Sequence, residues 1–114
     1  MSDCIFCGIA AGSVPANLVR RDDDVVAFRD INPQAPTHIL VIPAEHVDSA
    51  AELTPAHDHL WARLLHVAQS IAEDEGMEPE GYRLVVNVGR NGGQTVDHLH
   101  VHLLGGRQMT WPPG

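Results

Sequence analysis

The chain has 114 residues, 44% of them hydrophobic, which fits one domain with a modest core over residues 1–114. Its formal charge of −8 leaves no large basic surface for a phosphate backbone and argues against nucleic acid as a partner. No apolar run approaches the roughly 20 residues that span a bilayer, and the N-terminus lacks the pattern of a signal peptide. We therefore expect a soluble cytoplasmic protein with no membrane partner.

The first predicted elements are a short helix and a hairpin. Cys4 to Ala11 suits a short helix, because Gly12 follows it and glycine commonly ends a helix. Asn17 to Arg21 and Val25 to Arg29 predict two strands. The three aspartates between them are interpreted as a solvated turn, and we assign them no chemistry.

The middle of the chain predicts a loop, a strand and the longest helix. Residues 32–36 read Asn-Pro-Gln-Ala-Pro and predict a loop, because each proline restrains itself and the residue before it. His38 to Ile42 is rich in β-branched residues and predicts a short strand that ends at Pro43. Pro55 to Glu75 predicts a helix with Thr54 as its N-cap.

The long predicted helix carries an apolar stripe and three histidines. Every third or fourth residue is apolar, which is typical of an amphipathic helix on a sheet. Trp61 and Leu65 lie beside the stripe and are interpreted as core or interface residues. The histidines of this helix have no partner motif and are interpreted as surface residues: His57, His59 and His66.

Two more strands complete the predicted sheet. They run from Tyr82 to Val88 and from His98 to Leu104, with a Gly-Asn-rich turn between them. Strands joined by a short loop pair in an antiparallel way. The sequence therefore predicts an α+β fold with a five-stranded antiparallel sheet, one long helix and one short helix.

The last predicted strand contains the most informative pattern, His98-Leu-His-Val-His102. Side chains alternate between the faces of a strand, so the three histidines should share one face, with successive ones about 7 Å apart. The aliphatic residues between them should take the other face. One face is thus predicted to pack and the other to carry chemistry.

Two chemistries suit three imidazoles on one face. One neutral ring can attack phosphorus while another donates a proton, because imidazole titrates near neutral pH, and this scheme needs no metal. The backbone amides and side chains of residues 92–95, Gly-Gly-Gln-Thr, could line the phosphate. The same rings could instead hold zinc or another transition metal, and the periodicity alone does not decide between the two.

The two cysteines of the chain, Cys4 and Cys7, are separated by two residues. In a reducing compartment this spacing does not indicate a disulfide framework. A Cys-x-x-Cys pair can supply half of a tetrahedral zinc site, and two further ligands must then come from elsewhere in the fold. A metal site and free thiols are both open on the sequence.

The motif His98-Leu-His-Val-His-Leu-Leu104 resembles the signature of the histidine triad (HIT) family. Further segments are similar to its HINT branch, the histidine triad nucleotide-binding proteins: Asp3 to Cys7, Asp30 to Pro43, Val85 to Gly89 and Gly105 to Gly114. This resemblance implies a homodimer in which two five-stranded sheets form one ten-stranded sheet. It also implies hydrolysis of purine nucleoside 5′-phosphoramidates through a covalent nucleotidyl-histidine intermediate, without a metal in catalysis.

Carried onto this chain, the resemblance implies a role for each catalytic histidine. His100 would be the nucleophile, His102 would contact the phosphate and the leaving group, and His38 matches a fourth histidine near the nucleophile. The other implied contacts to a purine nucleoside monophosphate or phosphoramidate are Phe28, Asp30, Ile31, Asn87, Gly93, Gln94, Thr95 and Trp111.

Two of these contacts carry a more detailed expectation. Asp30 would accept hydrogen bonds from the ribose hydroxyls, whereas the residue alone indicates a loop carboxylate that caps the local backbone. Trp111 would reach across the dimer to the partner's leaving-group pocket. Two positions depart from the family pattern, since Thr95 stands where serine is frequent and Thr110 where eukaryotic members often have histidine.

The resemblance also sharpens the interpretation of the cysteines. Some bacterial members hold a structural zinc with the first triad histidine as a ligand, which implies a site of Cys4, Cys7, His46 and His98 here. Two alternative functions stay open beside the phosphoramidase. One is hydrolysis of dinucleoside polyphosphates, the activity of another branch, and the other is a nucleotide-binding adaptor whose hydrolysis is incidental.

Overall fold

The computed structural model describes residues 4–114, so Asp3 of the N-terminal motif lies outside it. Five strands, two α-helices and two short 3₁₀ turns follow one another along the chain: α1 (Ile5–Ala11), β1 (Leu18–Arg21), β2 (Val25–Arg29), β3 (Thr37–Pro43), η1 (Ala50–Glu52), η2 (Pro55–His57), α2 (Asp58–Asp74), β4 (Tyr82–Val85) and β5 (Val101–Gly105). The predicted α+β class and antiparallel sheet are confirmed. None of the described helices is long and apolar enough to cross a membrane.

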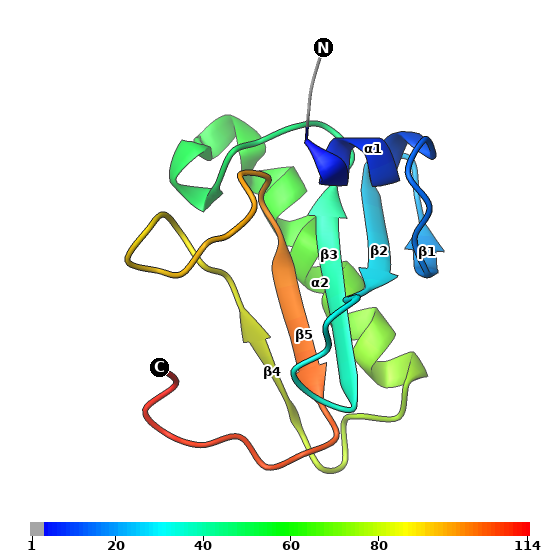
Figure 1. Cartoon of the computed structure of the whole chain (residues 1–114), viewed down its shortest axis with the longest axis vertical. Helices are drawn as coiled ribbons and strands as arrows, with labels where there is room; N and C mark the ends of the chain where they lie inside the picture. The colour runs from blue at the N-terminus through cyan, green and yellow to red at the C-terminus, as the bar shows by residue number, and fades with distance from the viewer. Residues whose placement is uncertain (1–3) are drawn as a thin grey trace.

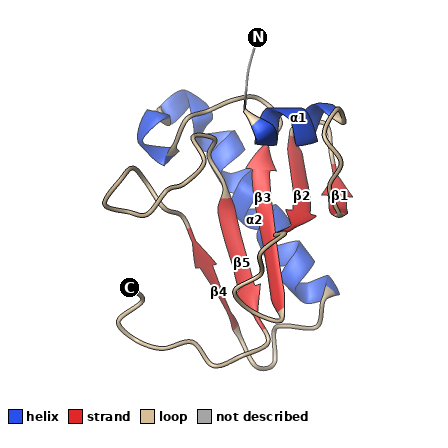
Figure 2. Ribbon diagram, viewed as in Figure 1, coloured by secondary structure: helices blue, strands red, loops and turns tan. Residues whose placement is uncertain are grey.

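The sheet has the order β1-β2-β3-β5-β4, and every neighbouring pair is antiparallel. Helix α2 runs behind the sheet, while α1 lies across the other face at one end of β2 and β3 (Figure 1). Strand β4 lies at one edge, and the C-terminal segment ends on the same side of the molecule (Figure 2). The lower part of the front face is thus left uncovered by either helix.

The two faces of the sheet are both apolar but are covered differently. The main core lies between the sheet and α2, where Leu99, Val101 and Leu103 are almost completely buried. A smaller cluster on the opposite face gathers Phe6 and Phe28 under α1. The predicted alternation of the histidine segment is confirmed, because its aliphatic residues enter the main core while its histidines point to the face of α1.

The histidine segment is nevertheless strand only in its second half, because β5 begins at Val101. Pairing with β3 stops at Val41 opposite Val101. The next positions cannot extend the ladder, since Pro43 has no N–H and its carbonyl lies 2.9 Å from His98 Nε2. The Leu99 N–H instead donates to Val47 O at 2.7 Å. The prediction of a strand from His98 was therefore wrong in its first three residues.

Apart from shifts of a single residue, the other boundaries differ from prediction at three places. Helix α2 begins at Asp58, because Thr54 caps a separate 3₁₀ turn and its N–H donates to His57 Nδ1 at 2.9 Å. His57 therefore has a capping role that the sequence interpretation missed. Strand β4 ends at Val85, three residues early, and the short turn η1 was not predicted.

The acidic turn between β1 and β2 is not merely solvated. Arg63 on α2 donates to Asp22 at 2.9 Å and to both carboxylate oxygens of Asp24 at 3.1 Å. The turn is thereby fastened to the long helix. On that helix, Trp61 packs against the core as predicted, whereas Leu65 is 38% exposed.

Candidate active site and metal centre

A cleft of about 880 Å³ opens on the face of the sheet that α2 does not cover. Strand β3 supplies His38 to it, the segment leading into β5 supplies His100, and β5 itself supplies His102. Apolar side chains from α1 and β2 also line it, among them Phe6 and Phe28. The cleft therefore combines an apolar lining with three imidazoles.

The protonation of His100 follows from its backbone contact. His100 Nδ1 lies 2.7 Å from the carbonyl oxygen of His98, and a carbonyl can only accept, so Nδ1 carries the proton. In the neutral ring, Nε2 then keeps its lone pair. His100 is 5% exposed and lines the cleft, and the ring of Phe6 packs edge-on against it at 5.3 Å. The hydrogen bond therefore fixes the ring so that Nε2 is the nitrogen left without a backbone partner in the cleft.

His38 and His102 form a pair beside His100. Their rings approach with His38 Nε2 2.9 Å from His102 Nδ1, and the His100 and His102 ring centres are 4.9 Å apart. Burial lowers the pKa of His38, against the opposing effect of the Asp30 carboxylate. Burial, with the neighbouring His100 and His38, lowers the pKa of His102 to about 4. Both rings are therefore neutral at physiological pH.

The first triad histidine lies outside the cleft, among the cysteines. His98 is completely buried, and its Nδ1 is 3.3 Å from Cys4 Sγ and 3.5 Å from Cys7 Sγ. His46 Nδ1 lies 3.2 Å from Cys7 Sγ. All four ligand atoms lie within 4.8 Å of one another, so the structure brings together the four residues predicted for zinc.

The spacing and the outer contacts of this group fit a tetrahedral zinc ion. Zn–S and Zn–N bonds of about 2.3 and 2.0–2.1 Å imply S···N separations of roughly 3.6 Å, close to the distances seen here. The outer nitrogen of each histidine is held, His46 Nε2 by Asp48 at 2.6 Å and His98 Nε2 by the Pro43 carbonyl. Such contacts orient both inner nitrogens as ligands.

The charge state of Cys4 is consistent with the same conclusion. Burial raises the pKa of the Cys4 thiol, but hydrogen bonds led by the Cys7 N–H outweigh it and leave that pKa below its usual range. The hydrogen bond to Asp48 raises the pKa of His46, which favours the protonated ring, so a zinc ion would have to displace a proton from this histidine. A thiolate is the form of cysteine that binds zinc.

A second group of possible ligands, Asp30, His38 and His102, fits a metal poorly. The backbone N–H of Gln34 donates to His38 Nδ1 at 3.0 Å, so Nδ1 has no proton. If His38 Nε2 also bound a metal, the ring would have to be an imidazolate, which is far less accessible than neutral imidazole. We therefore read this group as a hydrogen-bonded chain.

The cleft contains only some of the predicted nucleotide-binding residues. Phe28, Asp30, Ile31 and Thr95 line it, and the Ile31 side chain is fully exposed at its rim. Asp30 Oδ1 accepts from the Asn32 N–H at 2.8 Å, while Oδ2 lies 3.5 Å from His38 Nε2. Asp30 thus caps the local backbone, as its residue type alone indicated, and also faces the cleft.

The remaining predicted contacts lie outside the cleft. Asn87 lines a smaller hollow of about 220 Å³ on the other side of His102. Gly93 N–H donates within its turn, and the amide group of Gln94 donates to two carbonyls, Asp48 O and Val96 O. Trp111 is 82% exposed.

Three contacts that sequence reasoning missed support the site. Asp48 orients His46, and the pair His46-x-Asp48 was a visible signal for it. The ring of Phe6 contacts both His98 and His100, with ring centres 5.9 and 5.3 Å apart. The third contact is the Gln34 backbone N–H, which donates to His38. Almost every residue type has such a group, so the sequence carried no signal for it.

The match to a family model decides the relationship. The HIT domain model matches residues 11–109. The chain belongs to the HIT family. Within the family, it is 47% identical over 107 residues to the purine nucleoside phosphoramidase of Escherichia coli K12, covering 94% of this chain and 90% of that protein. It is 50% identical to a 14 kDa zinc-binding protein of Zea mays, covering 99% of this chain and 89% of the maize protein.

The HIT fold is also found in solved structures. The structure of a HIT family hydrolase from Legionella pneumophila superimposes with a TM-score of 0.97 at 52% sequence identity, covering 98% of this chain and 100% of that one. The five-stranded antiparallel sheet with two α-helices is therefore the fold of the family.

Proposed function

We propose that the protein is a hydrolase of purine nucleoside 5′-phosphoramidates that acts through a nucleotidyl-His100 intermediate. The observation that carries the proposal is the hydrogen bond from His100 Nδ1 to the His98 carbonyl, because it leaves Nε2 as a lone-pair nucleophile in the cleft. The phosphoramidase activity of the E. coli relative supports the substrate class.

The reaction divides into two displacements at phosphorus. In the first, His100 Nε2 forms a bond to phosphorus while the P–N bond to the amine breaks, and the leaving nitrogen takes one proton from the solvent, to which the second step returns a proton. In the second, water attacks phosphorus, the P–Nε2 bond breaks, and the water gives up a proton as the nucleoside monophosphate forms. No step needs a metal, and two moderate barriers replace one high barrier.

The cleft and the residues around it offer a contact for each part of such a substrate. The base would lie against Phe28 and Ile31, and the Asp30 carboxylate would accept hydrogen bonds from the ribose diol. His102 would face the phosphate and the leaving group. Asn87, Gly93, Gln94 and Thr95 are proposed for the phosphate and ribose side, with the Gln94 amide acting through the loop that it closes.

The test is turnover of an adenosine phosphoramidate with intact-mass analysis of the quenched reaction. Wild type should release adenosine monophosphate and carry a transient adduct of one nucleotide, and His100→Ala should lose both. A matched substitution on the surface of α2, His66→Ala, should retain both. No turnover by wild type would remove the enzyme proposal, and turnover of dinucleoside polyphosphates alone would support the other hydrolase branch.

An adaptor role predicts a different result for His100→Ala. In that case, cells or partner complexes would respond to the variant in the same way as to wild type, although the variant had lost turnover. A difference between the two proteins would tie the biological role to hydrolysis. The same variant therefore serves both questions.

We also propose that Cys4, Cys7, His46 and His98 bind one structural zinc, supported by their tetrahedral spacing and by the maize relative. When bound, zinc would join α1 to the segment that carries the nucleophile, without contact to the reacting atoms. Untagged protein never exposed to chelator should contain one zinc per chain, and Cys7→Ser well under one. Activity that disappears with chelator and returns with metal would instead indicate a metal-dependent catalyst.

We further propose a homodimer in which the β4 edges of two chains pair and extend the sheet to ten strands. β4 has a sheet partner on one side only, and Leu84 on it is 37% exposed. Arg83 of the same strand donates to the Thr110 carbonyl at 2.9 Å and so holds the C-terminal segment near this edge. Trp111 is thereby close to where a partner would dock.

A further inference from the structure

The donor that His102 presents to the cleft is fixed by a chain of hydrogen bonds. His102 Nε2 is buried, and it is the one buried side-chain nitrogen or oxygen in residues 4–114 that has no hydrogen-bond partner. A buried polar atom without a partner costs free energy, and such atoms often mark a place where a ligand supplies the partner. Its role depends on whether Nε2 carries a proton or a lone pair.

The backbone N–H of Gln34 determines which nitrogen of His102 carries the proton. The Gln34 N–H can only donate, so His38 Nδ1 accepts and the proton of neutral His38 lies on Nε2. His38 Nε2–H in turn faces His102 Nδ1 at 2.9 Å, with Asp30 Oδ2 as a second acceptor at 3.5 Å. Neutral His102 therefore accepts at Nδ1 and carries its proton on Nε2, toward the cleft.

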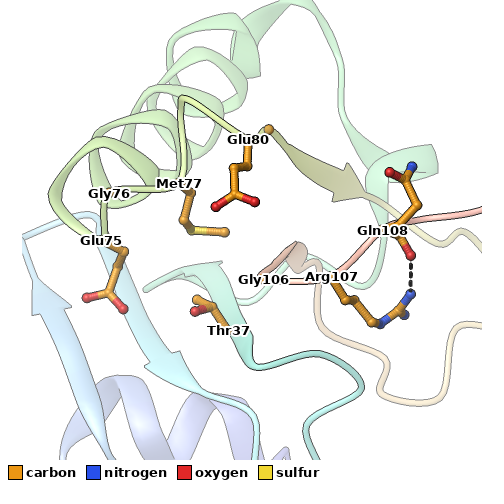
Figure 3. A pocket seen from close by; sticks show the side chains of 9 residues that line it. Thr37, Glu75, Gly76, Met77, Glu80, Gly106, Arg107 and Gln108 are labelled. Atoms are coloured by element: carbon orange, nitrogen blue, oxygen red, sulfur yellow. Dashed lines mark hydrogen bonds between the residues drawn. The ribbon is translucent and has the colours of Figure 1, made fainter.

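The position of Gln34 depends in turn on a residue near the C-terminus. Arg107 Nε donates to the Gln34 carbonyl at 3.0 Å, and its Nη1 donates to the Gln108 carbonyl at 3.3 Å. Figure 3 shows the Arg107 guanidinium bent back onto Gln108. One arginine thus holds both the proline loop and the segment after β5.

The residue before Arg107 makes this approach possible. Gly106 has a φ of +91°, and a Cβ on it would lie 2.8 Å from Pro36 Cβ. Only glycine combines that backbone conformation with so close a packing against the proline loop. The corner at Gly106 therefore brings Arg107 onto Gln34.

We propose that Arg107 is a positioning residue for the reaction: through Gln34 and His38 it keeps His102 as an Nε2–H donor aimed at the phosphoryl group and the leaving atom. The inference rests on the proposed function for the identity of the acceptor. His102 here acts by donating a hydrogen bond, since giving up its only proton would leave an imidazolate. Arg107 does not line the main cleft and acts through the loop.

The first experiment reads the ring tautomers directly and does not depend on activity. ¹⁵N-labelled wild type should show His38 and His102 both protonated at Nε2 near neutral pH. Arg107→Met should give a mixture of tautomers at both rings. Gln34→Pro, which removes the N–H donor, should do the same, while Gln34→Ala, which keeps that N–H, should resemble wild type.

The second experiment measures turnover of an adenosine phosphoramidate by the same variants. For Arg107→Met we expect kcat to fall roughly tenfold or more with a much smaller change in KM, because misplaced catalytic groups cost that much without lost binding contacts. Arg107→Lys should recover part of kcat. Arg20→Met, which removes the exposed pair with Asp74 at the far side of the sheet, should match wild type.

The outcomes separate this inference from the proposed function. Protonation of wild-type His38 at Nδ1 overturns the inference, whatever the activity. So does an Arg107→Met variant with wild-type tautomers and wild-type kcat. If the tautomers are as assigned but wild type turns over no phosphoramidate, the proposed function fails and the hydrogen-bonded chain stands. If Arg107→Met does not fold, the comparison of Gln34→Pro with Gln34→Ala decides.

Discussion

Each triad histidine has one ring nitrogen committed to a hydrogen bond, and in two of the three the partner is a backbone carbonyl. His98 donates from Nε2 to Pro43 O, and His100 donates from Nδ1 to His98 O. The nitrogens left with lone pairs therefore differ, being Nδ1 toward the cysteines and Nε2 toward the cleft. Three residues of one type gain distinct chemistry from the atoms that surround them.

The depressed pKa of His102 predicts how stability depends on pH. Its pKa is about 4 in the folded protein against 6.5 ordinarily, so unfolding takes up a proton between these values and stability falls as the pH drops through that window. At 1.36 kcal/mol per pKa unit, wild type should lose about 3 kcal/mol more than His102→Gln between pH 7 and pH 4. Urea unfolding at a series of pH values measures this difference.

The control for this prediction is another histidine substitution. His66→Gln changes an exposed residue on α2 and should keep the wild-type dependence on pH. Parallel curves for wild type and His102→Gln would show that His102 does not carry the effect. The titratable groups that face His102 are His38, His100 and Asp30, and all three remain in the variant.

At the scale of elements, Arg63 fastens the β1–β2 turn to α2. It contacts two aspartates, and Asp24 has a lowered pKa because of the hydrogen bonds from Arg63. We expect Arg63→Met to lower the free energy of unfolding by about 1 kcal/mol, since a bidentate network exceeds an isolated surface pair. Thermal unfolding at low and high salt measures it, and salt should shrink the difference.

A neighbouring aspartate supplies the control for Arg63. Asp23 is exposed and lies between the two paired carboxylates. Asp23→Asn should leave stability within a few tenths of a kcal/mol of wild type. A gain in stability from Asp23→Asn as large as the loss from Arg63→Met would mean that general charge repulsion in the turn, rather than the specific pairing, sets stability.

The proposed zinc would couple α1 to the rest of the fold, because two of its ligands lie at the start of α1 and two lie far along the chain. Binding at a hundredfold excess over Kd adds about 2.7 kcal/mol, so chelation should lower the Tm of wild type by roughly 10 °C. Cys7→Ser should have a Tm near that of chelator-treated wild type, and adding chelator should not change it. An unchanged wild-type Tm with chelator would contradict a structural metal.

The type of each helix and strand could be predicted where neighbouring residues determine it. The predicted boundaries were wrong where contacts with distant residues determine them. Gly12 ends α1 with a φ of +82°, as its residue type indicated. By contrast, β5 starts late because Pro43 lies opposite its predicted first residues, and α2 starts late because His57 accepts the Thr54 N–H. Neither contact is visible in a local sequence window.

The candidate site was predictable in its residue types but not in its geometry. Period-two spacing placed the three histidines on one face, whereas the resemblance alone divided their roles. The approach of Cys4 to His98 spans 94 residues of sequence, and no periodicity predicts such a contact. The link from Arg107 to Gln34 uses a backbone carbonyl, so it carried no sequence signal at all.

At the scale of the whole molecule, the two edges of the sheet differ. The β1 edge carries Arg20 and Arg21, whose guanidinium groups are taken up by α2 and by carbonyls at the end of α1. The β4 edge has one arginine, Arg83, whose guanidinium donates to the Thr110 carbonyl, and it presents Leu84, with Val88 beyond it 40% exposed. Charged edge residues discourage strand pairing, so β4, which carries fewer of them, is the edge that we propose for a second copy of this chain.

The proposed dimer predicts that Leu84→Arg separates the protein into monomers. A charge at a paired apolar edge would be buried without a partner, at a cost of several kcal/mol. Wild type should sediment at twice the chain mass of 12.4 kDa, and Leu84→Arg at that mass. The matched change on the other edge, Leu18→Arg, places the same charge on a residue that is 44% exposed and should leave the dimer intact.

If Trp111 completes the partner's leaving-group pocket, the monomer should also lose turnover of bulky phosphoramidates more than of small ones. A monomeric wild type, or dissociation by Leu18→Arg alone, would contradict pairing through β4.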